Sequence, residues 1–544
     1  MLHSLKTHWK RSAGTLTRRE LFQRSALLTI PAMFRGARLE AAPAAAAAPA
    51  PAGGLHVGKD IYESIGVRPL VNARGTFTII SGSLMLPEVR AAMDAAAQHH
   101  VQLDELMAGI GARLAELTKA GWGMVSSGCA AGLTHATAAC VAGGNPDLHI
   151  RIPNLAGFPR DEVIIPKHSR NVYDAAVRAT GIRVVEVGTA EELEAAFGPR
   201  TAMVYILAGP EADTGPLSTR AIAAAARARR VPVLVDAAAE ILTIPNVHLE
   251  AGASLVAYSG GKCLRGPQSA GLLLGRKDLV QAAWVHSAPH HGYARSMKVG
   301  KEEAIGMLMA VEMWVKRDHD AEWKKWLSWL DTIAKRVSTI DGVTTSVAET
   351  KALSNRTPSL TVRWDRKKLG VTGAAVARQL IDSEPRIATP GGRDRGDEAS
   401  ISITPYQMSD GDERIVADKL HAALSNPQTR EAPRVPTSPT ADVTGQWDVQ
   451  IDYVATRSTH TLHLKQVGNR LEGLHQGDFV ARDVSGSIDG DRVEIASSYT
   501  ERHGDALSFR FTGRAAGDQM SGTLDMGEYL TANWTAKRHE YRRS

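Results

Sequence analysis

Three polar residues stand directly after two apolar runs of the sequence. Asp236 follows residues 231–235, and Ser259 and Lys262 follow residues 255–258. Short β-branched runs of this kind predict buried strands of a parallel sheet, and the carboxyl ends of such strands meet at the edge where open α/β folds bind ligands. A carboxylate and a primary amine are therefore expected at one crevice, where a lysine can act as a nucleophile.

Glycines precede the lysine, in the run Ser259-Gly-Gly-Lys262. Glycine lets the backbone turn closely around a neighbouring group, which an ordinary surface lysine does not need. The alternative interpretation is a strand-end turn that carries a structural cation.

A third segment has the composition of an anion site. Residues 126–132 read Ser-Ser-Gly-Cys-Ala-Ala-Gly and lie between a predicted strand, residues 123–126, and an Ala-rich helix. The free N–H groups and the dipole at the start of such a helix bind a dianion, so Ser127, Gly128 and Cys129 are candidates to hold a phosphate, with a further hydroxyl from Ser259. Alone, this segment is only a strand-to-helix turn, and Asp236 alone could be a helix cap.

Together the three features predict a pyridoxal 5′-phosphate enzyme. In such enzymes a lysine holds the cofactor as a Schiff base, and an aspartate keeps the pyridine nitrogen protonated so that the ring stores electrons. We assign these roles to Lys262 and Asp236 because all three features occur in the required order along the chain.

The elements that must position these residues follow from the pattern of apolar residues. Residues 58–340 alternate short strands with Ala-rich helices, which indicates a large domain with a parallel sheet and, near residues 300–340, one long helix; residues 341–426 indicate a smaller α/β domain. After a Pro-rich linker, residues 427–441, apolar residues alternate with polar ones, with a period of two. Residues 442–544, with a hairpin turn at Gly468-Asn469, are therefore predicted to form a small antiparallel barrel, lipocalin-like in outline.

The first 40 residues have the composition of an export signal. Arg18 and Arg19 precede a short apolar segment, and an Ala/Pro-rich linker follows at residues 41–57. This arrangement resembles a twin-arginine signal and predicts a periplasmic or secreted protein without stable membrane insertion; the alternative is a disordered basic tail. The net charge of +6 is accounted for by the eight Lys/Arg and two Glu of residues 1–40, so the body lacks the charge of a nucleic-acid binder.

Residues 58–425 resemble the fold-type-I pyridoxal-phosphate family that includes selenocysteine synthase and D-glucosaminate-6-phosphate ammonia-lyase. The residues that carry the resemblance are Asp236, Ser127-Gly128 and the run from Ser259-Gly-Gly-Lys262 to Arg265-Gly-Pro-Gln268. It implies a homodimer or larger homo-oligomer and a small anionic amino-acid-like substrate. It also implies that His168 stacks on the cofactor ring, and that the substrate is bound by basic residues, for which the candidates are Arg74, Arg265, Arg295, Lys298 and Arg386.

Within that family an ammonia-lyase-type α,β-elimination on a small amino acid or amino-sugar acid fits best. Selenium transfer is disfavoured because the body lacks positive charge and because residues 80–84, Ile-Ser-Gly-Ser-Leu, lack an arginine that the resemblance would place there. Racemase, aldolase and aminotransferase activities would use the same residues, and a non-catalytic exported binding module is the alternative of another class. The histidine-rich loop around His286, His290 and His291 has no clear acidic or cysteine partner, so no metal site is expected.

Overall fold

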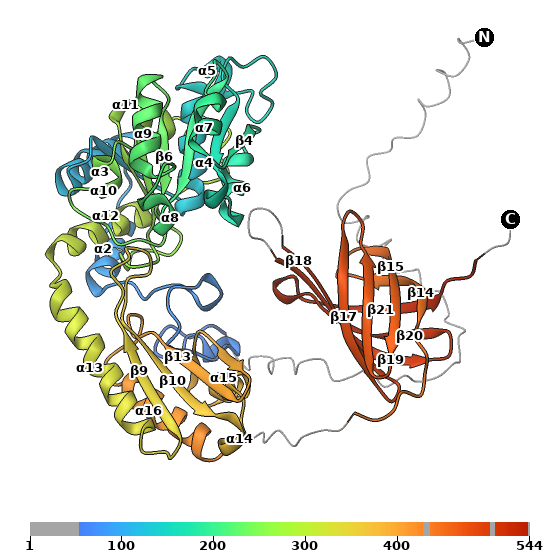
Figure 1. Cartoon of the computed structure of the whole chain (residues 1–544). Coiled ribbons are helices and arrows are strands. Elements are labelled where there is room, and N and C mark those ends of the chain that lie inside the picture. The colour runs from blue at the N-terminus through green and yellow to red at the C-terminus, as the bar shows by residue number, and fades with distance from the viewer. Residues whose placement is uncertain (1–53, 428–435, 501–505, 542–544) are drawn as a thin grey trace, which may run out of the picture. The chain divides into compact units, whose positions relative to one another are not determined.

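The structure is a computed structural model that describes residues 54–427, 436–500 and 506–541 (Figure 1). The expected export signal and residues 41–53 of the Ala/Pro linker lie outside the described residues. The chain divides into two compact units, residues 1–69 and residues 70–544. In the first unit, the described part contains a short 3-10 helix, η1 (Glu63–Ile65).

A seven-stranded sheet forms the centre of the large domain (Figure 1). In sheet order its strands are β2 (Trp122–Ser126), β8 (Gly271–Gly275), β7 (Leu255–Ser259), β6 (Val233–Asp236), β5 (Thr201–Leu207), β3 (Glu162–Pro166) and β4 (Arg183–Val187). Neighbours from β7 to β4 run parallel, as predicted. Strand β8 departs from that arrangement and is antiparallel to β2 and β7. The connection between β7 and β8 is only residues 260–270, and a parallel crossover needs a longer one, usually with a helix.

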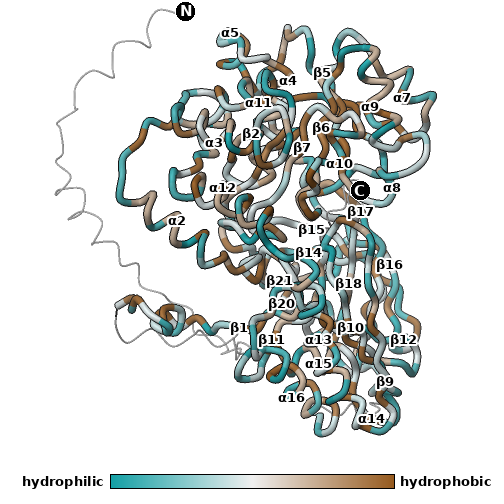
Figure 2. The backbone as a smooth tube through the Cα atoms, turned by 90° about the vertical axis from the view of Figure 1, so that its left-hand side faces the viewer, coloured by the Kyte–Doolittle hydropathy of each residue, from teal (hydrophilic) through white to brown (hydrophobic). Residues whose placement is uncertain are grey.

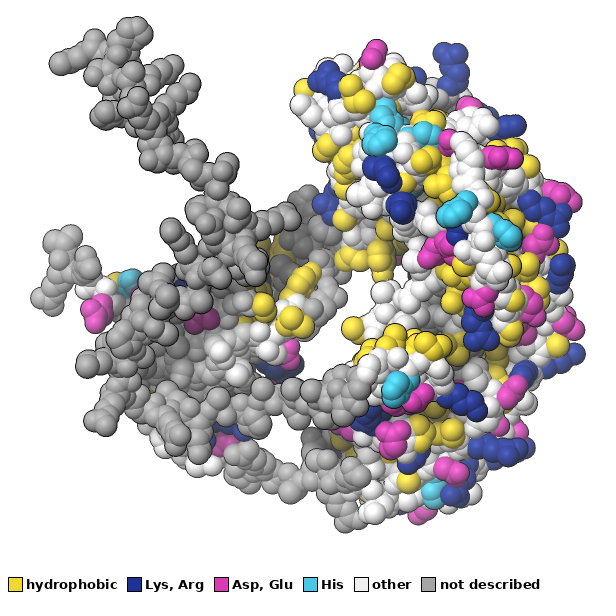
Figure 3. All heavy atoms as spheres, turned by 180° about the vertical axis from the view of Figure 1, so that it is seen from behind, with side chains coloured by type: hydrophobic (Ala, Val, Ile, Leu, Met, Phe, Trp, Pro, Cys, Tyr) yellow, Lys and Arg dark blue, Asp and Glu magenta, His cyan; other side chains and the backbone are white. Residues whose placement is uncertain are grey.

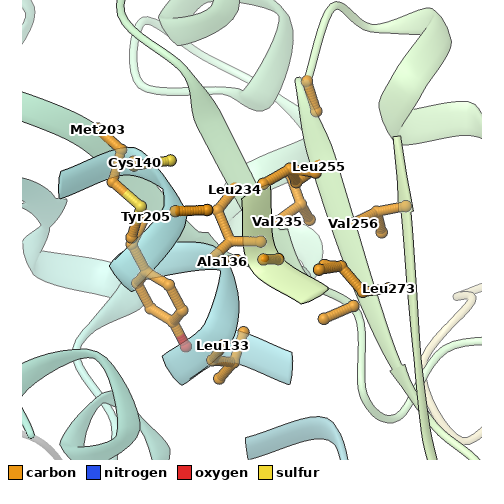
Figure 4. Packing of buried hydrophobic residues seen from close by; sticks show 14 of the residues in the cluster. Leu133, Ala136, Cys140, Met203, Tyr205, Leu234, Val235, Leu255, Val256 and Leu273 are labelled. Atoms are coloured by element: carbon orange, nitrogen blue, oxygen red, sulfur yellow. The ribbon is translucent and has the colours of Figure 1, made fainter. Parts of the chain in front are cut away.

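The sheet is apolar because helices cover it. Figure 2 shows hydrophobic colouring along β5, β6 and β7. Helix α4 (Cys129–Ala142) packs across β5, β6, β7 and β8, and its small Ala and Gly residues let it lie close to the sheet. Figure 4 shows Leu133, Ala136 and Cys140 of this helix facing side chains of β5 and β6, among them Tyr205. Tyr205 is fully buried in this otherwise aliphatic layer.

The remaining helices of the large domain lie around this sheet. They are α2 (Pro87–Ala97), α3 (Leu103–Thr118), α5 (Pro146–His149), α6 (Ala175–Arg178), α7 (Ala190–Ala196), α8 (Pro210–Asp213), α9 (Thr219–Ala228), α10 (Val247–Glu250) and α11 (Lys277–Trp284), with the 3-10 helices η2 (Thr78–Ile80), η3 (Lys167–Ser169) and η4 (Val172–Asp174).

The single long helix expected over residues 300–340 is two helices. Helix α12 (Lys301–Lys316) ends at Arg317, whose backbone is extended, and α13 (His319–Val337) begins after Asp318. The carboxylate of Asp318 accepts a 2.9 Å hydrogen bond from the Ala321 N–H and so caps the second helix. An N-cap residue adopts a non-helical backbone, which explains why the helix breaks here.

The small domain packs helices against a four-stranded sheet. The sheet has the order β12 (Gly392–Arg395), β13 (Glu398–Ile403), β10 (Ser359–Asp365) and β9 (Val343–Ala348), all antiparallel. Its helices are α14 (Arg366–Leu369), α15 (Gly373–Asp382) and α16 (Asp412–Ser425), and α13 packs against α16. A separate parallel pair joins β1 (Leu70–Asn72) to β11 (Arg386–Ala388). The segment that precedes the large domain's sheet is therefore paired with a strand of the small domain.

The C-terminal region is a closed eight-stranded antiparallel barrel, as predicted. Its strands, in order around the barrel, are β14 (Gly445–Asp452), β15 (Arg457–Val467), β16 (Arg470–Gln476), β17 (Ala481–Asp489), β18 (Arg492–Thr500), β19 (Ala506–Ala516), β20 (Gln519–Asp525) and β21 (Thr531–Arg538), with the 3-10 helix η5 (Gly527–Tyr529) before the last. Trp447, Val449 and Ile451 are buried, and the residues between them are not, which confirms the period of two.

The surface carries both signs of charge. On the face shown in Figure 3, acidic and basic side chains are interspersed rather than gathered into one basic field. No helix within the part of the chain that the structure describes is both long enough and apolar enough to cross a membrane.

Candidate active site

The turn between β2 and α4 forms an open anion cradle. Gly128 caps the helix with a φ of 91°, and a Cβ built there would meet no atom within 4 Å, so the space in front of the helix N-terminus is free. Gly271, the first residue of β8, lies directly against this turn, because its Cβ would come within 2.4 Å of the Gly128 carbonyl carbon. The sequence therefore needs glycine at both positions to form a helix N-terminus that a phosphate can reach.

Asp236 ends β6 as a fully buried carboxylate with several donors. Its Oδ2 accepts a 2.9 Å hydrogen bond from the Tyr205 hydroxyl, and its Oδ1 accepts from the Ala238 N–H at 3.1 Å and lies 3.6 Å from the Cys129 sulfur. Burial raises the pKa of Asp236, while the Tyr205 hydroxyl, the Ala238 N–H and the charge of Lys262 act in the opposite direction. The carboxylate thus lies beside the first residue of the cradle helix.

Lys262 follows β7 in a loop that folds back on itself. The Gly260 N–H donates to the Ala270 carbonyl at 2.8 Å, and the Gly266 N–H donates to the Gly260 carbonyl at 2.9 Å. A Cβ on Gly261 would lie 2.6 Å from the Cα of Gln268, so the glycines before the lysine are required by this close approach. The charge of Lys262 acts on both Cys129 and Asp236, so the amine lies near the carboxylate and the first residue of the cradle helix.

His168 lies in η3, directly after β3. Burial lowers the pKa of its imidazole, so the ring is neutral at neutral pH, and its buried Nε2 has no hydrogen-bond partner among the described residues. The nearby Asn171 donates a 3.0 Å hydrogen bond to the Tyr205 hydroxyl. A neutral ring with a spare nitrogen fits the predicted stacking role, which stays a prediction.

The five basic candidates differ in their surroundings. Arg295 and Lys298 are exposed on either side of Met297, whose carbonyl accepts a 2.9 Å hydrogen bond from Ser127, so this loop is joined to the cradle. Arg265 donates through Nε to the Leu84 carbonyl at 3.0 Å, which ties the Lys262 loop to the segment before α2.

The last two candidates lie after β1 and in β11. Arg74 lies over the ring of Phe77 at 4.2 Å, and its buried Nε has no partner within the described parts of the chain. Arg386 donates through Nε to the Ile381 carbonyl at 3.0 Å, so part of its guanidinium holds the end of α15. No contact joins Arg386 to Lys262 or to the cradle among the described residues, and its substrate-binding role remains a prediction.

Comparison with known proteins identifies the family. A family model for class-V aminotransferases matches residues 167–296. D-glucosaminate-6-phosphate ammonia lyase of Salmonella typhimurium is 30% identical over 372 residues, which cover 66% of this chain and 94% of that protein. The chain belongs to this pyridoxal-phosphate-dependent family.

Other relatives and a solved structure agree with that membership. The 5′-C-glycyluridine monooxygenase-decarboxylase of a Streptomyces species is 33% identical over 373 residues, 65% of this chain and 90% of that protein. An L-seryl-tRNA(Sec) selenium transferase of Moorella thermoacetica is 28% identical but matches only 43% of this chain and 53% of its own length. A solved structure of D-glucosaminate-6-phosphate ammonia-lyase superposes with a TM-score of 0.59 at 28% identity and covers 67% of this chain and 98% of that one.

Pyridoxal 5′-phosphate is the cofactor of this family, and the residues of this class-V member fit it. The free space before α4 suits the phosphate, and the buried Asp236 suits a protonated pyridine nitrogen, which would lower the pKa of the carboxylate that burial raises. When bound, the cofactor stores the electron pair released when a bond to the α-carbon of an amino acid breaks. Lys262, whose charge acts on Asp236 and Cys129, would supply the amine.

Tyr205 and Asn171 are part of this site, although the sequence did not single them out. The chain Asn171–Tyr205–Asp236 orients the carboxylate from β5, which lies on the other side of β6 from β7. In the sequence, Tyr205 lies within an apolar run, residues 202–207. A tyrosine in an aliphatic buried strand needs a partner for its hydroxyl, and this need was the signal available in the sequence.

The histidine-rich loop lies apart from these contacts. Both nitrogens of the buried His286 lack partners among the described residues, and its ring stacks on His149 at 4.4 Å. No group of three or more His, Cys, Asp and Glu side chains in the described parts of the chain is arranged to hold a metal ion. The expectation that no metal binds here stays a prediction.

Proposed function

We propose that this enzyme catalyses α,β-elimination on a small anionic amino acid or amino-sugar acid, with release of ammonia. The observation that carries the proposal is that Asp236 contacts Cys129 at the start of the Gly128 cradle, with Lys262 near enough for its charge to act on both. Support for the reaction type comes from the similarity to D-glucosaminate-6-phosphate ammonia lyase, which extends over 94% of that protein.

Each group has one task in this reaction. Lys262 Nζ would hold the cofactor covalently, and the same amine, once free, would take the proton from the substrate α-carbon. Asp236 holds the proton on the pyridine nitrogen, and the N–H groups at the start of α4 hold the phosphate. The bond from the β-carbon to its leaving group then breaks, and the released enamine reacts with water to give a keto acid and ammonia.

The basic residues favour an anionic substrate. Arg295 and Lys298 are exposed beside the cradle, on the loop that Ser127 holds, and an exposed cation can bind a carboxylate or a second phosphate of the substrate. Arg74 has a buried, unpartnered Nε among the described residues, which is a second donor available to an anion. Double substitution of Arg295 and Lys298 to Gln should raise KM much more than it lowers kcat.

One comparison favours oxidative decarboxylation as a second candidate reaction. The chain is 33% identical to a protein named as a monooxygenase-decarboxylase, a slightly higher identity than to the ammonia lyase. Oxidative decarboxylation starts at the same α-carbon but breaks the bond to the carboxylate and consumes dioxygen. The two reactions differ in their products, since elimination releases ammonia and a keto acid without oxygen uptake, and oxidative decarboxylation releases carbon dioxide.

The first experiment tests the lysine. The purified full-length protein should show a visible absorption band, roughly near 420 nm for a protonated conjugated imine, which borohydride removes. Lys262→Ala should lack the band, whereas Lys167→Ala should keep it, because Lys167 also follows a strand but lacks the glycine loop. A band that persists in Lys262→Ala and disappears in Lys167→Ala would overturn the assignment.

The second experiment tests the reaction. Wild-type enzyme is incubated with amino acids and amino-sugar acids that carry a β-leaving group, and ammonia, carbon dioxide and oxygen uptake are measured together. Ammonia without oxygen uptake supports elimination. Carbon dioxide formed with oxygen uptake would replace the proposed reaction by oxidative decarboxylation.

We also propose that the enzyme is exported through a twin-arginine signal and acts as a homo-oligomer. The pair Arg18-Arg19 before an apolar segment supports export. Exposed apolar residues after β1, Phe77, Ile79 and Leu84, support contact with a second copy. Replacing Arg18 and Arg19 by Lys should leave the protein in the cytoplasmic fraction, and light scattering should give at least twice the mass of one chain; the opposite results contradict these proposals.

A further inference from the structure

The C-terminal barrel has two unlike ends. At one end, two-residue turns connect β15 to β16 and β17 to β18. At the other end the connections are longer, residues 453–456 after β14 and 477–480 after β16. We call this second end the wide mouth. Near the opposite end the interior is filled by apolar side chains such as Trp447, Leu471 and Val493.

Polar side chains replace the apolar ones inside the wide mouth. His460, His475, Arg482 and Ser497 are buried inward-facing residues of the consecutive strands β15, β16, β17 and β18. His475 lies directly opposite Arg482 in the ladder between β16 and β17. Polar residues at interior positions of a small barrel are costly unless they are paired or serve a ligand.

The two histidines and the serine of this cluster hydrogen-bond to one another. His460 Nδ1 and His475 Nε2 share a hydrogen bond of 2.9 Å, and His475 Nδ1 bonds to the Ser497 hydroxyl at 2.7 Å. Burial lowers the pKa of His475 to about 3, so its ring is neutral at neutral pH. The histidines therefore form an uncharged chain along the barrel wall.

The guanidinium of Arg482, in contrast, has donors without hydrogen-bond partners in the described parts of the chain. Only 7% of the residue is exposed, and its Nε and Nη1 are buried without a hydrogen-bond partner among the described residues. The nearby Asp478 accepts a 2.6 Å hydrogen bond from Ser458, and its charge acts on Arg482, but no hydrogen bond or ion pair joins the two side chains among the described residues. The guanidinium lies over the ring of Phe509 at 4.7 Å. A buried guanidinium with free donors lacks a directly bonded anion, which normally accompanies it.

We propose that the wide mouth of the barrel binds the oxyanion group of a small organic acid or phosphate ester, with Arg482 as its main donor. The guanidinium fork matches a carboxylate or phosphate. Phe509 and Tyr453 supply apolar surface for the rest of the ligand, and the rim residues Val454 and Phe479 are exposed by 81% and 97%. Eight-stranded barrels are of a size that holds one small ligand.

A metal ion is the competing occupant, and the charges disfavour it. His460, His475 and Asp478 are ligand types for zinc, but the positive charge of Arg482 acts on both histidines in the direction that lowers their pKa values. The same charge repels a divalent cation. The two histidine nitrogens that face each other are also already joined by their own hydrogen bond.

Isothermal titration of the full-length holoenzyme tests the site, with benzoate and inorganic phosphate as separate probes at millimolar concentrations. Binding of at least one probe is expected, and the better probe shows whether the site prefers a carboxylate or a phosphate. Arg482→Met should weaken binding by about tenfold or more, because a charge-assisted bidentate contact is lost. Arg510→Met is the matched control, since Arg510 lies on the barrel exterior and pairs with Glu494 at 3.1 Å.

The variants also cover the case in which Arg482→Met fails to fold. Arg482→Lys keeps the charge but not the fork, so it should bind the better probe more weakly than wild type and more tightly than Arg482→Met. No binding of either probe to the wild type, or equal binding by wild type and Arg482→Lys and Arg482→Met, overturns the proposal. Zinc binding that Arg482→Met retains and His460→Gln loses would show a metal site in its place.

Discussion

The Tyr205 hydroxyl donates a 2.9 Å hydrogen bond to Oδ2 of Asp236, and Asn171 holds that hydroxyl from its other side at 3.0 Å. Tyr205 and Asp236 are both buried, and a hydrogen bond to a charged group is strong in the protein interior. The ionised state of Asp236 therefore depends on a residue that is neither the proposed Schiff-base lysine nor part of the cradle turn.

Tyr205→Phe should impair the enzyme through Asp236. The hydroxyl acts to lower the pKa of Asp236, so its loss raises that pKa further and moves the acid limb of the kcat/KM profile to higher pH. We expect kcat/KM to fall by about ten- to a hundredfold, the range of a lost hydrogen bond to a charge. Tyr258→Phe is the control, because the buried Tyr258 bonds to Asn246 at 2.7 Å and not to Asp236; an equal acid-limb shift in both variants would contradict this role.

Gly271→Ala should weaken cofactor binding without touching any group that contacts substrate. The new Cβ would lie 2.4 Å from the Gly128 carbonyl carbon and 2.6 Å from the Cys129 nitrogen, so the cradle must move. Overpacking typically costs about 1–3 kcal/mol, and we expect the Kd for pyridoxal phosphate to rise by about tenfold. The measurement is titration of the apoenzyme. Gly109→Ala, on an exposed face of α3 with no atom within 4 Å, should leave the Kd unchanged.

Buried histidines should make stability depend on pH. Burial lowers the pKa of His286 to about 3, below its value in the unfolded chain, so the unfolded state binds the proton more tightly. Stability from the neutral ring is then fully present above about pH 6.5 and is lost as pH falls toward the folded value, by about 2 kcal/mol at pH 5 for one such group. Urea unfolding of His286→Leu should show a smaller loss between pH 7 and pH 5 than wild type. His291→Leu, at an exposed position, should behave as wild type.

Asp174 should contribute strongly to the free energy of unfolding. Its fully buried carboxylate accepts hydrogen bonds from Arg170 Nε at 2.6 Å and Arg178 Nε at 2.7 Å. Asp174→Ala leaves Arg178 without this partner and Arg170 with only Glu186, at 2.8 Å, and we expect a loss of about 3 kcal/mol in the free energy of unfolding. Asp161→Ala breaks a surface pair with Arg200 and should cost at most about 1 kcal/mol. Similar losses for the two variants in urea unfolding would refute the distinction.

The sequence predicted the elements of the site because each depends on local pattern. The apolar run before Asp236 and the Ser-Gly-Cys turn before α4 are visible in a short window, and the structure has both. The antiparallel course of β8 and the break at Asp318 were missed because an apolar pattern does not report strand direction or a single cap. Tyr205 was missed because its partner Asp236 lies 31 positions away and meets it only through sheet pairing.

The loop that carries Lys262 is held at several points by its own backbone. Hydrogen bonds from Gly260 to Ala270, from Arg265 to Lys262 and from Gly266 to Gly260 fix its course, and the Cys263 sulfur lies 3.2 Å from the Glu240 carbonyl. The entropy of ordering this segment is therefore lost when the chain folds and not when a ligand arrives. In the role proposed for Lys262, only its side chain would need to move during the reaction, because these hydrogen bonds already fix the backbone beneath it.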